Sequence, residues 1–243
     1  MAVSIDTVYQ RVLALANKEQ RGYITPQEFN LFANQAQMEI FEQYFYDIKE
    51  FNRTPGNNQE YSDPLSVLYE KIGIFEVLHG NSWMAANMPN VGGGYMKMSR
   101  EIYKIGTVKV SNNQAELLNT KDWDAVRHSP LTRPTEDRPI ATITSKGLIV
   151  AIGKNSYVTP LTTGVSMSIS FIKKPAKVQW AYVIVNDKAL YNDNIAVNFE
   201  LHPSEETELV YKILKLSGIN IKAAEVVQVA QTLEQTQVQQ EKQ

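Results

Sequence analysis

The spacing of apolar residues changes twice along this 243-residue chain. Up to about residue 94 apolar residues recur every three to four positions, and from Tyr95 they alternate with polar ones. After about residue 200 the helical spacing returns. Because the two periods do not fit the same backbone, they predict an α+β fold. We expect a helical bundle built from the N- and C-terminal helices, residues 1–94 and 200–243, with an inserted antiparallel β sandwich or barrel-like domain at 95–199.

The N-terminal region is predicted to hold a short helix at 4–16 and a long one from Pro26 to about Phe51. At 1.5 Å per residue the long helix would measure about 39 Å. Its aromatic stripe is too wide to be left in water. Phe41, Tyr44 and Phe45 in this stripe are therefore candidate interface residues. An intrachain core is the alternative interpretation for each of them.

The segment between these helices, NKEQRGYITPQE (17–28), superficially matches an EF-hand calcium loop. Such a loop needs oxygen ligands at its first, third and fifth positions, and the fifth is Arg21, which offers no lone pair. A helix–turn–helix explains every residue. Gly22 would end the first helix, Thr25 would be the N-cap of the second, and Pro26 with Glu28 would complete a capping box.

The middle of the chain is predicted to be mostly strands. The expected strands are 102–110, 140–144, 148–152, 165–171 and 178–185, with a turn at 111–113 and a hairpin turn at 145–147. Residues 65–79 are expected to form a helix or a helix running into a strand, and 84–94 a mobile loop. One helical turn capped by Thr120 is expected at 120–126.

Helical spacing resumes near the C-terminus. Pro203–Glu206 should begin a helix, and Gly218 should end it. A last helix is expected from Lys222, with a glutamine-rich end that either frays or is ordered only by a partner.

No pattern in the sequence indicates catalysis, a cofactor or a metal site. The chain has no cysteine, and its three histidines, His79, His128 and His202, are isolated. Gly92–Gly94 lacks the Lys and Ser/Thr of a phosphate loop, which favours a hinge or interface loop. Asp122 and Asp124, two positions apart, do not share a helix face. We therefore expect a protein that is not an enzyme, although abundant carboxylates leave a cell-wall hydrolase as an alternative.

The charge balance argues against a dedicated nucleic-acid-binding domain. Twenty-four basic and 26 acidic residues give a net charge of −2. Lys173, Lys174 and Trp180 are further candidate interface residues. The two lysines could touch phosphates, and a solvated strand end is the alternative for this pair. No membrane-spanning segment and no signal peptide are expected. The absence of cysteine fits assembly in a reducing cytoplasm.

Three segments resemble the neck or ring proteins, also called head–tail adaptors, of crAss-like short-tailed bacteriophages. They are RGYITPQEFNLFANQAQMEIFEQYF (21–45), ISFIKKPAKVQW (169–180, containing Trp180) and FELHPSEETELVYKILKLSGINI (199–221). The resemblance covers most of the chain in order, and its motifs are structural.

The resemblance implies a virion structural protein that forms a closed, usually twelve-fold ring beneath the portal. Such a ring extends the DNA channel and links the portal to other neck rings and the tail. Genomic DNA would pass without sequence-specific binding, and the ring would assemble in the bacterial host cytoplasm. A second hypothesis is an attachment or decoration protein that binds a receptor or glycan through the β insertion, using Trp123, Trp180 and Tyr182.

Overall fold

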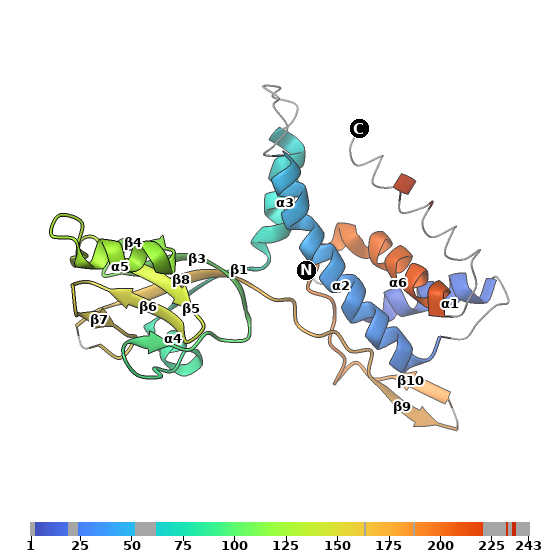
Figure 1. Cartoon of the computed structure of the whole chain (residues 1–243). Helices are drawn as coiled ribbons and strands as arrows, with labels where there is room; N and C mark the ends of the chain where they lie inside the picture. The colour runs from blue at the N-terminus through green and yellow to red at the C-terminus, as the bar shows by residue number, and fades with distance from the viewer. Residues whose placement is uncertain are drawn as a thin grey trace. The chain divides into compact units, whose positions relative to one another are not determined.

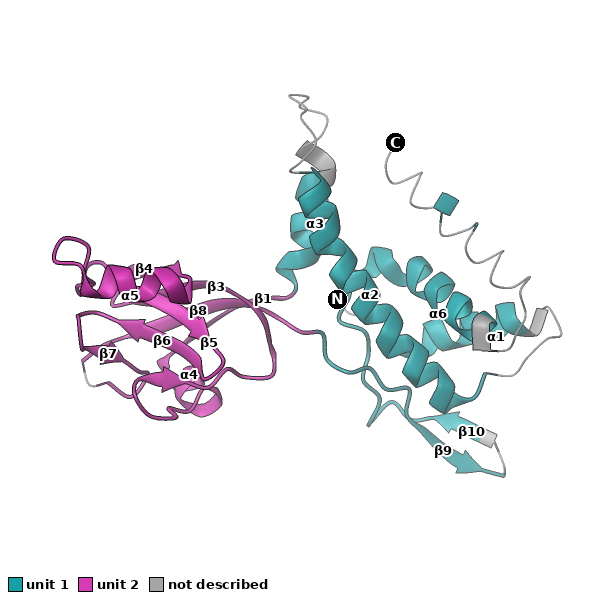
Figure 2. Cartoon of the chain, in the orientation of Figure 1, with its two compact units in different colours: residues 1–74, 175–243 teal, residues 75–174 magenta. Residues whose placement is uncertain are grey.

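The computed structural model describes residues 3–18, 24–51, 62–162, 164–186, 188–220, 232 and 235–236 (Figure 1). The chain forms two compact units (Figure 2). Unit 1 comprises residues 1–74 and 175–243, and unit 2 comprises residues 75–174. The protein is therefore α+β, with a sheet unit inserted between helical segments from the two ends of the chain.

The boundaries of the inserted unit differ from those expected at 94/95 and 199/200. Unit 2 begins earlier because β1 (Glu76–Gly80) pairs with β8 (Met167–Lys173). It also ends earlier, because residues 176–180 bind to a helix of unit 1 instead of the sheet. The two chain connections between the units lie at neighbouring strands of unit 2, because Glu76 of β1 lies opposite Ile172 of β8.

Unit 1 is built around the long helix α2. Its elements are α1 (Ile5–Lys18), α2 (Pro26–Phe51), α3 (Ser62–Gly73), the hairpin β9 (Tyr182–Val185) and β10 (Lys188–Tyr191), the 3-10 turn η2 (Pro203–Glu205) and α6 (Glu206–Asn220). The predicted bounds of α2 are confirmed. Its core-facing side is apolar, and α1 and α6 supply Val8, Val12, Leu209 and Ile213 to the same core.

The capping box at the start of α2 is confirmed. The Glu28 backbone N–H donates to the Thr25 hydroxyl over 3.3 Å, and the Thr25 N–H donates to the Glu28 carboxylate over 3.1 Å. The Thr25 hydroxyl also donates to that carboxylate over 2.8 Å, and Pro26 is the first helical residue. Glu28 is thus engaged by the cap. Gly22 lies outside the described residues.

Three amide side chains on α2 hold an extended segment of the chain from about 140 residues away. Asn30 accepts from the backbone N–H of Trp180 over 2.7 Å and donates to its carbonyl over 3.2 Å. Asn34 does the same to Val178, at 3.0 Å and 2.9 Å. Gln37 donates to the Ala176 carbonyl over 2.8 Å. We call this set of contacts the amide ladder.

The ladder works because two repeats match. One helical turn from Asn30 to Asn34 rises about 6 Å. Two residues of extended chain, from Trp180 to Val178, span about 6.6 Å. Side chains on successive turns can therefore bind alternate backbone positions of the strand. Each amide presents both a donor and an acceptor to the strand, as a neighbouring strand would.

Trp180 connects the ladder to α1. Its indole N–H donates to Asp6 over 2.9 Å, and its ring centroid lies 4.3 Å from that of Tyr9. Tyr9 packs in turn against Phe29 of α2 at 4.7 Å. The side chain of Trp180 is buried by these contacts.

Unit 2 is a single curled sheet with the order β1-β8-β3-β4-β5-β6-β2, and β7 also pairs with β6. The remaining strands are β2 (Tyr95–Met96), β3 (Ile102–Val110), β4 (Asn113–Leu118), β5 (Ile140–Thr144), β6 (Gly147–Ala151) and β7 (Tyr157–Val158). The sheet is mixed, because β4 and β5 run parallel while the other pairs are antiparallel.

The curl encloses one apolar core. Strands near both ends of the sheet contribute side chains to this core, among them Met96 of β2, Val150 of β6 and Ile169 of β8. Helix α4 (Asn81–Asn87) adds Met84, and Met88 follows it. Residues 84–94 were expected to be a loop throughout, but these two methionines, four positions apart, bury one helix face.

The predicted strands at 102–110 and 140–144 and the hairpin at 145–147 are confirmed. Gly147 adopts φ +129°, and a Cβ there would meet the Met96 carbonyl oxygen. Ser111 and Asn112 both have positive φ, as a two-residue hairpin turn requires. The strand β4 that follows was not predicted.

Two predicted helix ends are wrong in detail. Helix α5 (Thr120–His128) has Asn119 as its N-cap, and Thr120 is already helical. Helix α6 continues through Gly218 to Asn220. Gly218 is buried, so tertiary packing overrides its tendency to end a helix.

We predict that Asn34→Ala destabilises the protein by about 2 kcal/mol, because the substitution leaves the Val178 N–H and carbonyl without partners. Chemical unfolding monitored by circular dichroism measures the change. The neighbouring substitution Gln35→Ala is the control. It removes an exposed contact with Glu39 and should change stability by less than about 0.5 kcal/mol. Equal effects of the two substitutions would contradict the role of the ladder.

A second prediction concerns pH. Hydrogen bonds from the Thr25 hydroxyl and then its backbone N–H hold the pKa of Glu28 below its ordinary value. A lowered folded-state pKa contributes stability above the unfolded pKa, about 4.3, and that stability is lost as pH falls through the folded pKa. Glu28→Gln should therefore melt below the parent protein at pH 7, and the gap should close as the solution is acidified. In a Thr25→Val background the gap should be small at every pH.

Candidate interaction surfaces

The hairpin β9–β10 exposes an unusual amount of apolar surface. Residues directly opposite each other share a face, so Val183, Val185 and Leu190 lie on one side. All three are exposed. On the other side, Tyr182 and Tyr191 pack against Trp180, while Ile184 remains 67% exposed.

A two-stranded hairpin is marginally stable without support. This one is anchored at its base, where Tyr182 and Tyr191 contact the indole of Trp180 and the Asn192 N–H donates to the Ala181 carbonyl over 2.9 Å. The ladder in turn holds Trp180 to α2. Such a supported apolar element is suited to contact another protein.

The sequence carried a partial signal for this hairpin. A strand was predicted at 178–185, but 176–180 is the segment bound by the ladder, and β9 begins only at Tyr182. The second strand, β10, was not predicted. The run of four uncharged residues from Tyr182 does not alternate, which is typical of a strand buried on both faces, so nothing in the sequence indicated that this strand is exposed.

Three of the candidate interface residues prove to be core residues of unit 1. Phe41, Tyr44 and Trp180 are buried within the chain, and Phe45 is half-buried with its ring centroid 5.1 Å from that of Phe41. This burial favours the intrachain alternative. The Phe41 and Tyr44 side chains face the helices packed on α2, so they are not available to a neighbouring subunit.

Lys173 and Lys174 lie where β8 leaves unit 2. The Lys173 backbone N–H donates to the Phe75 carbonyl over 2.9 Å, and that of Lys174 to the Glu101 carbonyl over 2.8 Å. These bonds hold the chain at the unit boundary. The Lys174 side chain is exposed and that of Lys173 half-buried, so the expectation of phosphate contact at this pair stays a prediction.

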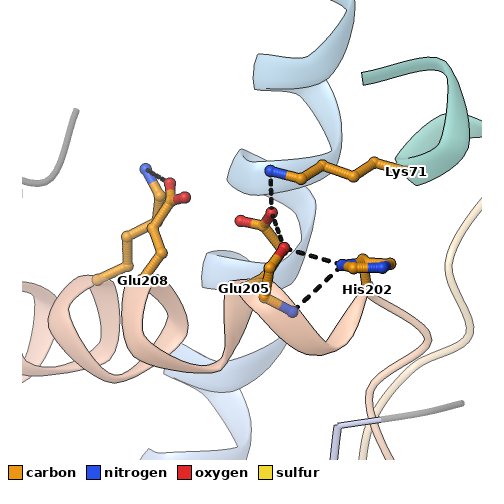
Figure 3. Close-up of polar contacts among 6 residues, drawn as sticks. Lys71, His202, Glu205 and Glu208 are labelled. Atoms are coloured by element: carbon orange, nitrogen blue, oxygen red, sulfur yellow. Dashed lines mark hydrogen bonds and ion pairs between the residues drawn. The ribbon is translucent and has the colours of Figure 1, made fainter. Parts of the chain in front are cut away.

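A buried polar cluster joins α3 to the start of α6 (Figure 3). The Lys71 ammonium lies 2.6 Å from the Glu205 carboxylate, whose side chain is 3% exposed. The Ser204 hydroxyl donates to the same carboxylate, and the His202 ring accepts from the Ser204 N–H as the N-cap of η2. The start of this helix at Pro203 is confirmed, with His202 in the capping role.

One turn further along α6, Glu208 pairs with Lys212 at 3.4 Å, and Lys212 also donates to Gln43 of α2. Arg11 of α1 pairs with Glu206 at 2.9 Å. Each carboxylate thus faces a cation from the same or a neighbouring helix, as buried charges require. The cluster has the arrangement of a structural network that fixes α1, α2 and α3 against α6.

The other sequence-selected groups are not brought together. His79 stacks on Trp83 at 4.3 Å, and His128 lies next to Arg127 at the end of α5. Within the described ranges, no three His, Cys, Asp or Glu side chains are placed to hold a metal ion. None of the helices in the described part of the chain combines the length and apolarity of a membrane span.

The near-neutral net charge conceals a division between the units. Unit 2 contains twelve Lys and Arg against seven Asp and Glu, a net of +5. Unit 1 contains twelve against nineteen, a net of −7. A basic unit and an acidic unit on one chain can attract each other between copies.

Comparison with known proteins does not identify the chain. No protein-family model and no curated protein sequence matches it.

Proposed function

We propose that this protein is a structural subunit of a ring in the virion neck of a short-tailed bacteriophage, where it links the portal to the tail. The observation that supports this best is the amide ladder. The three segments whose sequences resemble the neck proteins, 21–45, 169–180 and 199–221, meet there. Asn30 and Asn34 come from the first and bind the second, while Gln37 accepts from the Glu200 N–H in the third over 3.3 Å.

The exposed hairpin supports the same proposal. A closed ring repeats one contact between two different surfaces of the subunit. Each subunit then needs an apolar element that is rigidly held yet uncovered in the single chain. The hairpin, with Val183, Ile184 and Leu190 exposed and its base packed on Trp180, meets that requirement.

The proposed partners are further copies of this chain in a twelve-fold ring, the portal protein, and other neck and tail proteins. Genomic DNA would pass through the ring during packaging and ejection without sequence-specific contacts. The acidic excess of unit 1 suits a surface beside such a channel, because it does not hold phosphates.

The aromatic residues that motivated the alternative, an attachment protein that binds a glycan or receptor, do not form an exposed site on the β insertion. Trp123 of α5 is buried against Ile140 and Ile149 of the sheet. Trp180 is buried in unit 1, and Tyr182 belongs to that unit as well. Neither tryptophan offers a face for a sugar to stack on.

Native mass spectrometry of the full chain, alone and mixed with the portal protein of the same virus, tests the proposal. We expect a closed oligomer, either alone or on the portal. A protein that remains monomeric and never associates with portal or neck components would contradict it.

We further predict that Ile184→Asp prevents this assembly, because the substitution places a charge on a surface that must be desolvated. The melting temperature should change little, since Ile184 is exposed in the single chain. The matched control is Leu161→Asp at a loop residue of unit 2 that is 72% exposed. Assembly that survives Ile184→Asp would exclude the hairpin from the contact.

A further inference from the structure

One face of the sheet in unit 2 is uncovered over the strands β1, β8 and β3. Met167, Ile169 and Phe171 of β8 point into the core, so the alternate residues point outward. Residues opposite them share that outward face. Leu78 lies opposite Ser170, Lys104 opposite Ile172 and Lys109 opposite Ser168.

We call this surface the open sheet face. Its outward residues are Glu76, Leu78, Lys104, Lys109, Ser168, Ser170 and Ile172. Leu78 is 67% exposed, and both lysines are exposed. Helix α5 covers a different part of the sheet, over Ile140 and Ile149.

A second uncovered surface runs along α2. At 100° per residue, its exposed residues fall on one stripe that is separate from the core side and from the ladder. The stripe comprises Gln27, Leu31, Gln35, Glu39, Glu42, Tyr46, Lys49 and Glu50. Three acids and one base make it acidic. Near the C-terminal end, Tyr46 is 66% exposed between Glu42 and Glu50.

The two surfaces match in charge and in spacing. Glu42, Tyr46 and Glu50 are separated by steps of about 6 Å along the helix. Ser168, Ser170 and Ile172 are separated by steps of about 6.6 Å, and they carry Lys109, Leu78 and Lys104 beside them. Leu78 of β1 lies at a level between Lys109 and Lys104 of β3, on the other side of β8, and Glu76 lies at the level of Lys104. In a contact between the two surfaces the lysines would pair with Glu42 and Glu50, and Leu78 would pack beside Tyr46. The amide ladder shows the same match between turns of α2 and alternate strand positions.

We propose that the Glu42–Tyr46–Glu50 stripe of one copy binds the open sheet face of the next copy. This contact deepens the proposed function and rests on it, because it names two surfaces that, in addition to the hairpin, would join neighbouring subunits in the ring. The charge division supports a second copy as the occupant, since the stripe belongs to the acidic unit and the sheet face to the basic one. Leu78 at the centre would face phosphates in a complex with nucleic acid, which disfavours that occupant.

The cysteine-free sequence allows a direct test. Full-length Leu78→Cys and Tyr46→Cys are prepared separately, one of them with a mass tag, and mixed under the conditions in which the oligomer forms. A short thiol-reactive cross-linker should then join tagged to untagged chains. The matched control replaces Tyr46→Cys with Leu161→Cys, an equally exposed position outside the stripe, and should give at least tenfold less product.

A charge exchange provides the second measurement. A double variant with Lys104→Glu and Lys109→Glu should raise the protein concentration needed for half-assembly about tenfold. Mixing it with a copy that carries Glu42→Lys and Glu50→Lys should restore the original concentration. Oligomers that assemble normally without the Leu78–Tyr46 cross-link would overturn this contact and leave the proposed function standing. Absence of any oligomer, alone or with the portal, would overturn both. Half-assembly at an unchanged concentration in the lysine variant would exclude the lysines from the contact and overturn it.

Discussion

Unit 1 depends on the hydrogen bonds that α2 makes through its side chains. A helix satisfies its own backbone, so it cannot ordinarily extend a sheet. Asn30, Asn34 and Gln37 overcome this limit, because their amides present donors and acceptors at the repeat of an extended strand. Residues 176–180 are thereby fixed to α2. Trp180 in this segment also contacts α1 and the base of the hairpin.

The consequences reach both surfaces of unit 1 that have a proposed role. The hairpin β9–β10 keeps its aliphatic side chains in solvent only because its base is anchored on Trp180. The buried ion pairs of Lys71 with Glu205 and of Lys212 with Glu208 fix α3 and α6 on the other side of the unit. With its remaining sides occupied by core and ladder, α2 presents one continuous acidic stripe to its surroundings. A rigid unit with separate exposed surfaces is what repeated head-to-tail association requires.

Unit 2 reaches its own stability differently. Its curled sheet encloses a core with side chains from both ends of the strand order, and α5 shields part of the outer side. The remaining outer side, over β1, β8 and β3, carries lysines and a leucine. The division of charge, basic in unit 2 and acidic in unit 1, could have been counted from the sequence, because the expected insertion at 95–199 is also basic. With boundaries at 94/95 and 199/200, residues such as Lys173 and Lys174 still fell in the β insertion, but β1 and the ladder segment were assigned to the wrong units.

Local interactions determined the features that the sequence alone predicted. Thr25, Pro26 and Glu28 placed the start of α2 because a capping box involves only four consecutive residues. Alternation along 165–171 likewise predicted which side of β8 is buried. Tertiary structure alone decided what the polar residues of α2 bind. Asn30 and Asn34 are ordinary surface residues in any helical pattern, and their partners lie about 140 positions away. The burial of Phe41 and Tyr44 within the chain and the continuation of α6 through Gly218 were decided in the same way. Each depends on which segments pack together, and periodicity along one segment carries no information about its distant neighbours.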